Sequence, residues 1–298
     1  FFRSFSVLSF FSFRPPRPFP ASLAFPPRAH PVTPQDGEII PLWPDGAPGF
    51  EDRKNDAEVV EKGSVTNVHY PTLTAFRPPE DQVNGVAIVI APGGGLRKLG
   101  MKGGGFDPAK FLASHGYTTF VLKYRLSRQP GVAYKFEEHV LQDGQRAIRM
   151  VRHRAKEFGI DPDKVGMLGF SAGGEVVSIT CYKPGAGDPD AADPVDRLGA
   201  KPNFQMLVYP GPVGIPSKLP ADTPPAFMLI AADDNHTSVL LNLAQRFREI
   251  NVDYEAHIYA RGGHGFGMGT RSKRLSIQKW PQRMIDWLHD EVLNEIPK

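Results

Sequence analysis

A short glycine- and serine-containing segment, Gly169–Gly173 (GFSAG), has the residue types of a nucleophilic turn. It follows the apolar stretch Lys164–Phe170, which predicts a strand, and it precedes a predicted helix. In the Gly-x-Ser-x-Gly pattern, the small residues let the serine adopt a strained backbone conformation, so that its hydroxyl projects beyond the end of the strand. Ser171 is therefore the candidate nucleophile for acyl transfer. The alternative is an ordinary turn between a strand and a helix.

A serine hydroxyl becomes a good nucleophile only when a base takes its proton. His264 lies in the glycine-rich segment Gly262–Gly267, directly after the predicted strand Tyr254–Tyr259. The glycines leave room for the imidazole to approach the serine. His264 is therefore the candidate base, and a structural loop histidine is the alternative.

Two adjacent acidic residues, Asp233 and Asp234, follow the predicted strand Ala226–Ala231. They give the chain order serine, acid, histidine, which is typical of hydrolases with this kind of nucleophilic turn. One of the two carboxylates is expected to orient the imidazole, while the other caps a turn or a helix. His236 is interpreted as a residue of the surface or of the pocket wall.

Acyl transfer places negative charge on a carbonyl oxygen, and one preorganised N–H donor typically lowers the barrier by about 3 kcal/mol. The residue after the nucleophile, Ala172, offers one such donor. The loop after the apolar run Gly85–Ala91 offers others, because its glycines let the backbone approach a substrate closely. Gly93 and Gly94 are the candidate donors of this oxyanion hole, and Gly95 is expected to help the turn.

Other site types lack their residues in this chain. Gly95 is followed five residues later by Gly100 and Met101, so the lysine and the hydroxyl residue of a phosphate-binding loop are missing, and no Gly-x-Gly-x-x-Gly opens a helix. No His-Glu-x-x-His or other metal-ligand pattern is found, and the single cysteine, Cys181, excludes an internal disulfide and a cysteine-rich zinc site. We therefore expect neither a metal nor a cofactor.

The elements that must position these residues alternate between strand and helix. This order predicts an α/β fold with a mostly parallel sheet and helices on both faces. Ligands of such sheets bind beyond the carboxyl ends of the strands, where the candidate residues fall. The expected strands are 68–76, 85–91, 117–124, 164–170, 205–209, 226–231 and 254–259. The expected helices are 107–115, 136–158, the segment after Ser171, 239–250 and 277–294.

Composition limits the classes of partner. The chain has 298 residues, of which 41% are hydrophobic and 22% are charged, as is usual for globular proteins. A net charge of +3 is too small to imply nucleic acid or an acidic membrane as partner, and no run of apolar residues is long enough to span a bilayer. A single catalytic domain is expected over residues 36–298.

Residues 1–35 form an N-terminal extension of different composition. Residues 1–30 hold eight of the twenty Phe, six Pro and four Arg, and no acidic residue. One interpretation is a signal-like leader that directs export, and the other is an extension without a part in the chemistry of a cytoplasmic protein. Residues 31–65 are rich in Pro, Gly and charge, and we expect no regular elements there.

Several segments together resemble the acetylxylan-esterase-like branch of the α/β hydrolases, which is also described as hemicellulose esterase or "endo-xylanase B-like". The motifs that carry the resemblance, in order, are Ala91–Gly95, Leu122–Leu126, Asp143–Ala147, Phe158–Pro162, Gly169–Gly174, Tyr209–Pro210, Ala231–Asp234 and Gly262–Phe266. The resemblance implies removal of acetyl or other short acyl groups from small or oligosaccharide esters through a covalent acyl-enzyme. It also implies that the second aspartate, Asp234, is the catalytic one.

Two positions differ from the pattern of this branch and leave the substrate open. Relatives often carry Glu-Gly after the glycine loop, where this chain has Lys102–Gly105, and often a histidine after the turn, where it has Glu175. Gly104 and Glu175 are thus candidates for lining or bracing the pocket. A prolyl-oligopeptidase-like peptidase and a non-catalytic binding module with a hydrolase fold are the alternative functions.

Overall fold

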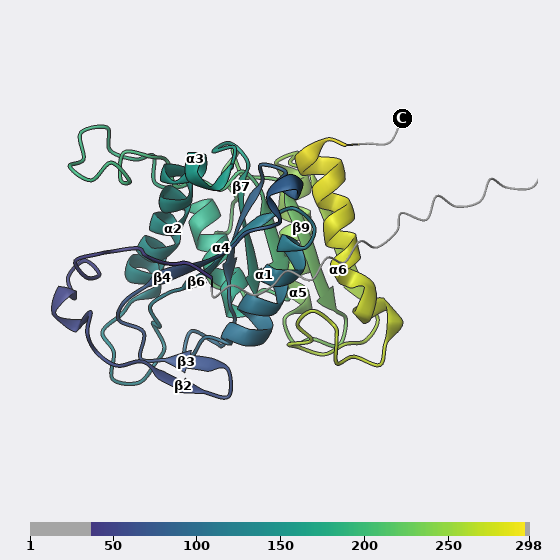
Figure 1. Cartoon of the computed structure of the whole chain (residues 1–298). Coiled ribbons are helices and arrows are strands. Elements are labelled where there is room, and N and C mark those ends of the chain that lie inside the picture. Colours follow the sequence, from purple (N-terminus) through teal and green to yellow (C-terminus); the bar gives the residue numbers. More distant parts are fainter. Residues whose placement is uncertain (1–36, 296–298) are drawn as a thin grey trace, which may run out of the picture. The chain divides into compact units, whose positions relative to one another are not determined.

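The computed structural model describes residues 37–295, which form an eight-stranded sheet in the order β1-β4-β6-β5-β7-β8-β9-β10 (Figure 1). The predicted N-terminal leader or extension lies outside these residues. The strands of the sheet are β1 (Ile39–Pro41), β4 (Thr72–Phe76), β5 (Ala87–Ala91), β6 (Thr118–Lys123), β7 (Val165–Phe170), β8 (Gln205–Val208), β9 (Ala226–Ala231) and β10 (Tyr254–Tyr259).

The strands from β5 to β10 pair in parallel, which confirms the predicted α/β class. Strands β1 and β4 complete the sheet as an antiparallel edge. The expectation of no regular elements in residues 31–65 is wrong, because β1 and the hairpin of β2 (Val59–Glu61) and β3 (Ser64–Thr66) lie there or next to it. These three-residue strands are held by their pairing partners and have no periodic pattern of their own.

Helices cover both faces of the sheet. Helices α1 (Asp107–Ala113) and α6 (Leu275–Trp287) lie on the face turned toward the viewer in Figure 1, while α2 (Leu141–His153) and α4 (Ala172–Tyr182) pack against each other on the other face. Helix α5 (Thr237–Glu249) packs against β9 and β10. Short helical turns complete the chain: η1 (Glu51–Arg53), η2 (Glu80–Gln82), η3 (Lys102–Phe106), η4 (Phe136–Val140), α3 (Ala155–Phe158) and η5 (Leu288–Leu293).

The helix predicted over 136–158 is divided into three pieces. It begins as the π-helical turn η4, continues as α2, and breaks at Arg154, where φ is −95° and ψ is 10°, before α3. Gly159 then ends it in the left-handed region with φ at 65°, as the sequence predicts. The strand runs predicted as apolar are buried along their whole length in β5, β7 and β9. In residues 37–295, no helix has both the length and the apolar character needed to cross a lipid bilayer.

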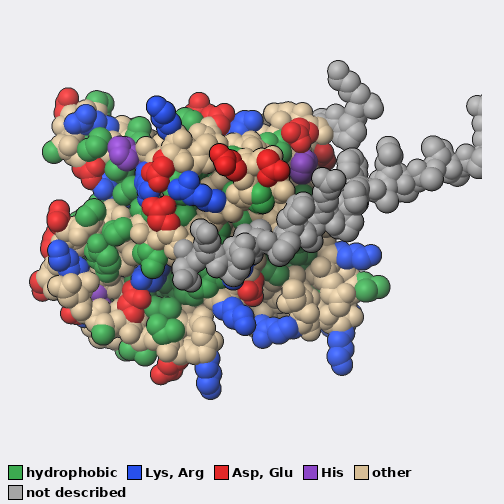
Figure 2. Space-filling model, in the orientation of Figure 1, with side chains coloured by type: hydrophobic (Ala, Val, Ile, Leu, Met, Phe, Trp, Pro, Cys, Tyr) green, Lys and Arg blue, Asp and Glu red, His purple; other side chains and the backbone are tan. Residues whose placement is uncertain are grey.

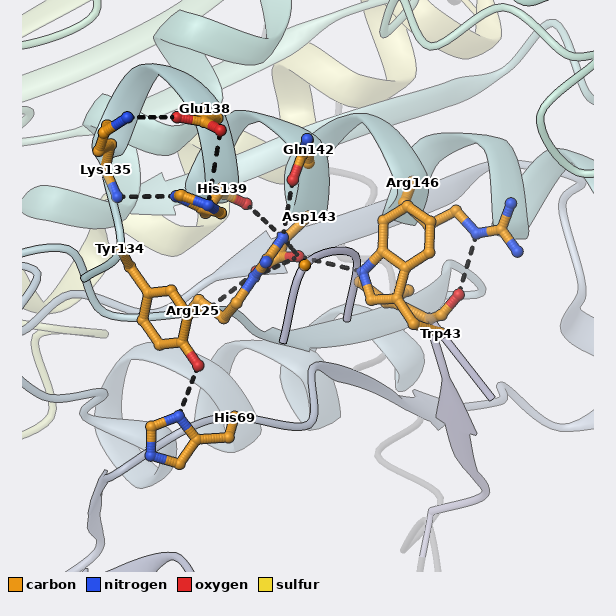
Figure 3. Close-up of polar contacts among 12 residues, drawn as sticks. Trp43, His69, Arg125, Tyr134, Lys135, Glu138, His139, Gln142, Asp143 and Arg146 are labelled. Atoms are coloured by element: carbon orange, nitrogen blue, oxygen red, sulfur yellow. Dashed lines mark hydrogen bonds and ion pairs between the residues drawn. The ribbon is translucent and has the colours of Figure 1, made fainter. Parts of the chain in front are cut away.

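A buried ion pair joins the end of β6 to α2 (Figure 3). The side chains of Arg125 and Asp143 are both 0% exposed, and Arg125 Nη2 lies 2.8 Å from Asp143 Oδ1. Asp143 also accepts hydrogen bonds from the Arg125 backbone N–H at 2.9 Å and from Trp43 Nε1 at 3.2 Å. The carboxylate of Asp143, on α2, thus binds both the segment after β1, through Trp43, and the loop after β6, through Arg125.

We expect Asp143→Ala to lower the free energy of unfolding by about 3–5 kcal/mol, because it leaves the Arg125 guanidinium buried without its counter-charge. Urea unfolding followed by circular dichroism measures this change. Glu138→Gln is the matched control, since it removes an exposed ion pair with Lys135 on the same helical segment. Equal stability of the two variants contradicts the structural role of the buried pair.

Candidate active site

Ser171 occupies the sharp turn between β7 and α4. Its backbone has φ at 54° and ψ at −122°, a combination that costs energy for any residue with a side chain. A Cβ atom at Gly169 would overlap the backbone of Gly173, and one at Gly173 would overlap the carbonyl oxygen of Ala91. The two glycines of the motif are therefore required by the close approach of β5, β7 and α4.

A continuous hydrogen-bond chain starts at this serine. Ser171 Oγ lies 2.7 Å from His264 Nε2, and His264 Nδ1 lies 2.7 Å from Asp234 Oδ2. The Asp234 side chain is 0% exposed, whereas that of His264 is 39% exposed. When Nδ1 donates to the carboxylate, Nε2 is left as the acceptor for the serine proton. The structure thus brings the three predicted catalytic residues together in an arrangement that can activate a hydroxyl.

The two aspartates take different positions. Asp234 reaches His264 with one carboxylate oxygen and accepts the backbone N–H of His236 with the other, at 2.9 Å. Asp233 Oδ1 instead accepts the backbone N–H groups of Gly262 and Gly263, each at 2.8 Å, and these bonds lower the pKa of Asp233. Asp233 therefore holds the loop that precedes His264, while Asp234 contacts the imidazole.

Tyr209 supports the histidine loop, a role that the sequence analysis missed. Its ring packs edge-on against His264 with 4.9 Å between ring centroids, and its hydroxyl accepts the backbone N–H of Gly267 at 3.0 Å. Burial raises the pKa of Tyr209, so the phenol stays neutral. From the other side, Trp280 Nε1 donates to the carbonyl of Gly267 at 2.9 Å. The signals in the sequence were the place of Tyr209 at the end of an apolar run and its presence in the Tyr209–Pro210 motif of the family resemblance.

The predicted oxyanion loop lies against the nucleophilic turn. A Cβ at Gly93 would come within 2.5 Å of the carbonyl oxygen of Phe170, so only glycine fits there. Tyr124 Oη donates to the carbonyl of Pro92 at 2.7 Å and fixes the start of the loop. Within residues 37–295, the N–H groups of Gly93 and Gly94 have no hydrogen-bond acceptor and remain available to a ligand. Their role as oxyanion donors, with Ala172, remains a prediction.

An open cleft of about 790 Å³ runs over Ser171 and His264. Phe170, Tyr209 and Phe266 contribute aromatic surface to its wall. Backbone glycines form much of the rest; they are Gly63, Gly93, Gly94, Gly95, Gly100, Gly103, Gly104, Gly265 and Gly267. The cleft can therefore accommodate a substrate considerably larger than an acetyl group.

Gly104 and Glu175 take the two roles that the sequence left open. Gly104 lines the cleft. A Cβ atom added at Gly104 would lie 3.4 Å from the backbone nitrogen of Gly93. Glu175 is only 3% exposed and lies behind the nucleophilic turn, where its Oε1 accepts the backbone N–H of Val213 at 3.3 Å. Its Oε2 is buried without a hydrogen bond, 3.8 Å from Arg128 Nη1, and burial raises the pKa of Glu175. Glu175 thus braces the loop after β8.

Three potential metal ligands gather beside the nucleophile, although the sequence analysis found no such cluster. Ligand atoms of Asp234, His236 and His264 lie within 4.8 Å of one another. However, the 2.7 Å separation of Asp234 Oδ2 and His264 Nδ1 is that of a direct hydrogen bond, and a metal bound by both atoms would need to break it. The donor set therefore fits proton transfer better than metal binding.

Comparison with known proteins shows that the chain is similar to esterases. The family model BD-FAE matches residues 73–194. The acetylxylan esterase of Xylanibacter ruminicola is 30% identical over 231 residues, which cover 66% of this chain and 44% of that protein. The chain thus spans less than half the length of this curated relative.

Solved structures of hydrolases share the fold of this chain. An acetyl ester-xyloside bifunctional hydrolase from Caldicellulosiruptor lactoaceticus has a TM-score of 0.69 at 27% identity, over 86% of this chain and 96% of that one. MGS-M1, an α/β hydrolase from a deep-sea metagenome library of the Medee basin, has a TM-score of 0.62 at 22% identity, over 87% and 99% of the two chains. The α/β-hydrolase fold and the resemblance to acetylxylan esterases are confirmed.

The raised pKa of Glu175 predicts a specific dependence of stability on pH. Because this pKa lies above its usual value of 4.5, the folded protein binds more protons than the unfolded chain above that pH. The stabilisation is fully present below 4.5 and is lost as the pH rises through the raised pKa. We therefore expect Glu175→Gln to gain stability relative to the unsubstituted protein as the pH rises.

Urea unfolding at several values between about pH 4.5 and pH 8 measures this difference. Glu249→Gln, which changes an exposed glutamate at the end of α5, serves as the control and is expected to show no such trend. A pH-independent difference between Glu175→Gln and the unsubstituted protein contradicts the prediction.

Proposed function

We propose that this protein is a serine esterase that removes acetyl or other short acyl groups from carbohydrate or small esters. The observation that carries the proposal is the hydrogen-bond chain from Ser171 through His264 to Asp234 at the floor of an open cleft. The similarity to an acetylxylan esterase and to an acetyl ester-xyloside hydrolase indicates carboxylic ester hydrolysis and supports a carbohydrate acetyl ester as substrate.

The first half of the reaction forms an acyl-enzyme. Ser171 Oγ attacks the acyl carbonyl carbon while His264 Nε2 accepts the hydroxyl proton. The N–H groups of Gly93, Gly94 and Ala172 are assigned to the oxyanion of the tetrahedral intermediate. The intermediate collapses as His264 returns the proton to the leaving alcohol oxygen, and the acyl group stays on Ser171.

The second half regenerates the serine. His264 takes a proton from water, and the resulting hydroxide attacks the acyl carbon. As the second tetrahedral intermediate collapses, His264 returns the proton to Ser171 Oγ and the carboxylic acid is released. The buried carboxylate of Asp234 keeps the imidazole tautomer in place and stabilises the imidazolium that forms in both halves. The chemistry of every step is supplied by side chains and backbone of this chain.

Ser171→Ala is expected to lower kcat for p-nitrophenyl acetate by at least about a thousandfold, because no other group can carry the acyl intermediate. Release of p-nitrophenol measures the rate. Ser217→Ala, an exposed serine outside the cleft, is the matched control and should keep full activity. Full activity of Ser171→Ala disproves the mechanism, and inactivity of the unsubstituted protein on short-chain esters favours a binding module or, if peptides are cleaved, a peptidase.

The neighbouring aspartates allow a paired test of their roles. Asp234→Asn should lower kcat by about 10³- to 10⁴-fold, because an amide favours the wrong imidazole tautomer. Asp233→Asn keeps an oxygen that can accept the N–H groups of Gly262 and Gly263, so we expect a loss of less than about tenfold. Steady-state kinetics on p-nitrophenyl acetate separates the two. Equal losses contradict the assignment of Asp234.

A further inference from the structure

The charges that face the cleft are mainly positive. Lys62, Lys102 and Arg271 line it, and Asp107 is the one acidic residue among the described residues that do so. All four residues are exposed. The three basic residues come from separate segments: the turn of the β2–β3 hairpin, the start of η3, and the loop after His264.

The loops on both sides of Ser171 share this charge bias in their sequence. Residues 93–106 contain Arg97, Lys98 and Lys102 and no acidic residue. Residues 260–274 contain Arg261, Arg271, Lys273 and Arg274, and again no acidic residue. The net charge of the whole chain is only +3, so the excess of positive charge in these two loops is a local feature. Figure 2 shows several Lys and Arg side chains projecting from the lower edge of the molecule, where the hairpin and these loops lie in Figure 1.

The hairpin that carries Lys62 is fixed beside Lys102. Val65 and Leu99 exchange backbone hydrogen bonds of 2.8 Å in both directions, and the Lys102 N–H donates to the carbonyl of Gly63 at 3.3 Å. Lys62 has a positive φ of 48°, which a turn at this point requires. Two lysines are thus presented by neighbouring backbone segments at one side of the cleft, although like charges repel each other.

These three basic side chains form no ion pair with the described part of the chain. Among residues 37–295, no carboxylate oxygen lies within 4.0 Å of a charged nitrogen of Lys62, Lys102 or Arg271. In contrast, the nearby Lys123 pairs with Glu58 at 2.6 Å. Unpaired charges of one sign along a cleft attract ligands of the other sign and raise their local concentration.

We propose that the ester substrate is a carbohydrate that carries carboxylate groups, an acylated uronic-acid oligosaccharide, and that Lys62, Lys102 and Arg271 recognise these carboxylates. The proposal rests on the esterase function proposed above. The basic residues lie on three elements around the cleft, which suits single charges spaced along a chain. A compact phosphate dianion is usually held by clustered Arg side chains, whereas Arg271 is the one arginine among the described residues that line this cleft.

The test compares three acetylated substrates at low ionic strength: oligogalacturonates, neutral xylo-oligosaccharides of the same length, and a sugar phosphate. Release of acetate gives kcat/KM for each. We expect the acidic oligosaccharide to be preferred to the neutral one by about tenfold or more, and the preference to fall as salt screens exposed charges. Lys62→Gln, Lys102→Gln and Arg271→Gln should each reduce this preference by about two- to fivefold.

Lys279→Gln is the matched control, because it removes an exposed lysine of α6 that lies outside the cleft, and it should leave the preference unchanged. Hydrolysis of both oligosaccharides at equal kcat/KM overturns the inference while the esterase function stands. Preference for the sugar phosphate also overturns it. If neither p-nitrophenyl acetate nor any of these substrates is hydrolysed, the proposed function itself fails.

Discussion

The strained backbone of Ser171 is the constraint on which the rest of the site depends. A residue with φ at 54° and ψ at −122° is held only when its surroundings determine it, and such strain costs about 1–3 kcal/mol. Here the surroundings are β5, β7 and α4, which approach so closely that Gly169 and Gly173 cannot carry a side chain. The same approach brings the loop after Ala91 next to the serine. The geometry that exposes the hydroxyl therefore also places backbone N–H donors beside it.

The predicted oxyanion loop depends in turn on two adjacent residues at the end of β6, Tyr124 and Arg125, which make different contacts. Tyr124 donates to the carbonyl of Pro92, at the start of the loop. Arg125 forms the buried ion pair with Asp143 of α2. A buried ion pair is weak evidence for net stability, but it specifies geometry, because neither partner tolerates displacement from the other. The pair thus fixes the backbone from which Tyr124 reaches the loop.

Much of the central fold follows from local pattern. Strands β9 and β10 have the predicted bounds, and the order Ser171, Asp234, His264 was visible because each residue follows a predicted strand. Strands β1 to β3 were not predictable, because three residues carry no periodicity. In addition, β1 and β3 contact partners farther along the chain, β4 and Leu99 respectively. The support of the histidine loop by Tyr209 is likewise tertiary. The different roles of Asp233 and Asp234 could be assigned only from the structure or from the family resemblance.

The proposed catalytic residues and the charged rim lie on different kinds of element. Ser171 and Asp234 follow the fully buried strands β7 and β9, and His264 follows the edge strand β10. Lys62 and Arg271 lie on a peripheral hairpin and a peripheral loop, and exposed side chains there can change without disturbing the packing that holds the nucleophile. In the proposed mechanism, reaction type and substrate choice are therefore determined by separate parts of the chain. Similarity to relatives in the central sheet indicates the reaction type. The choice of substrate has to be inferred from the charges that this chain places around the cleft.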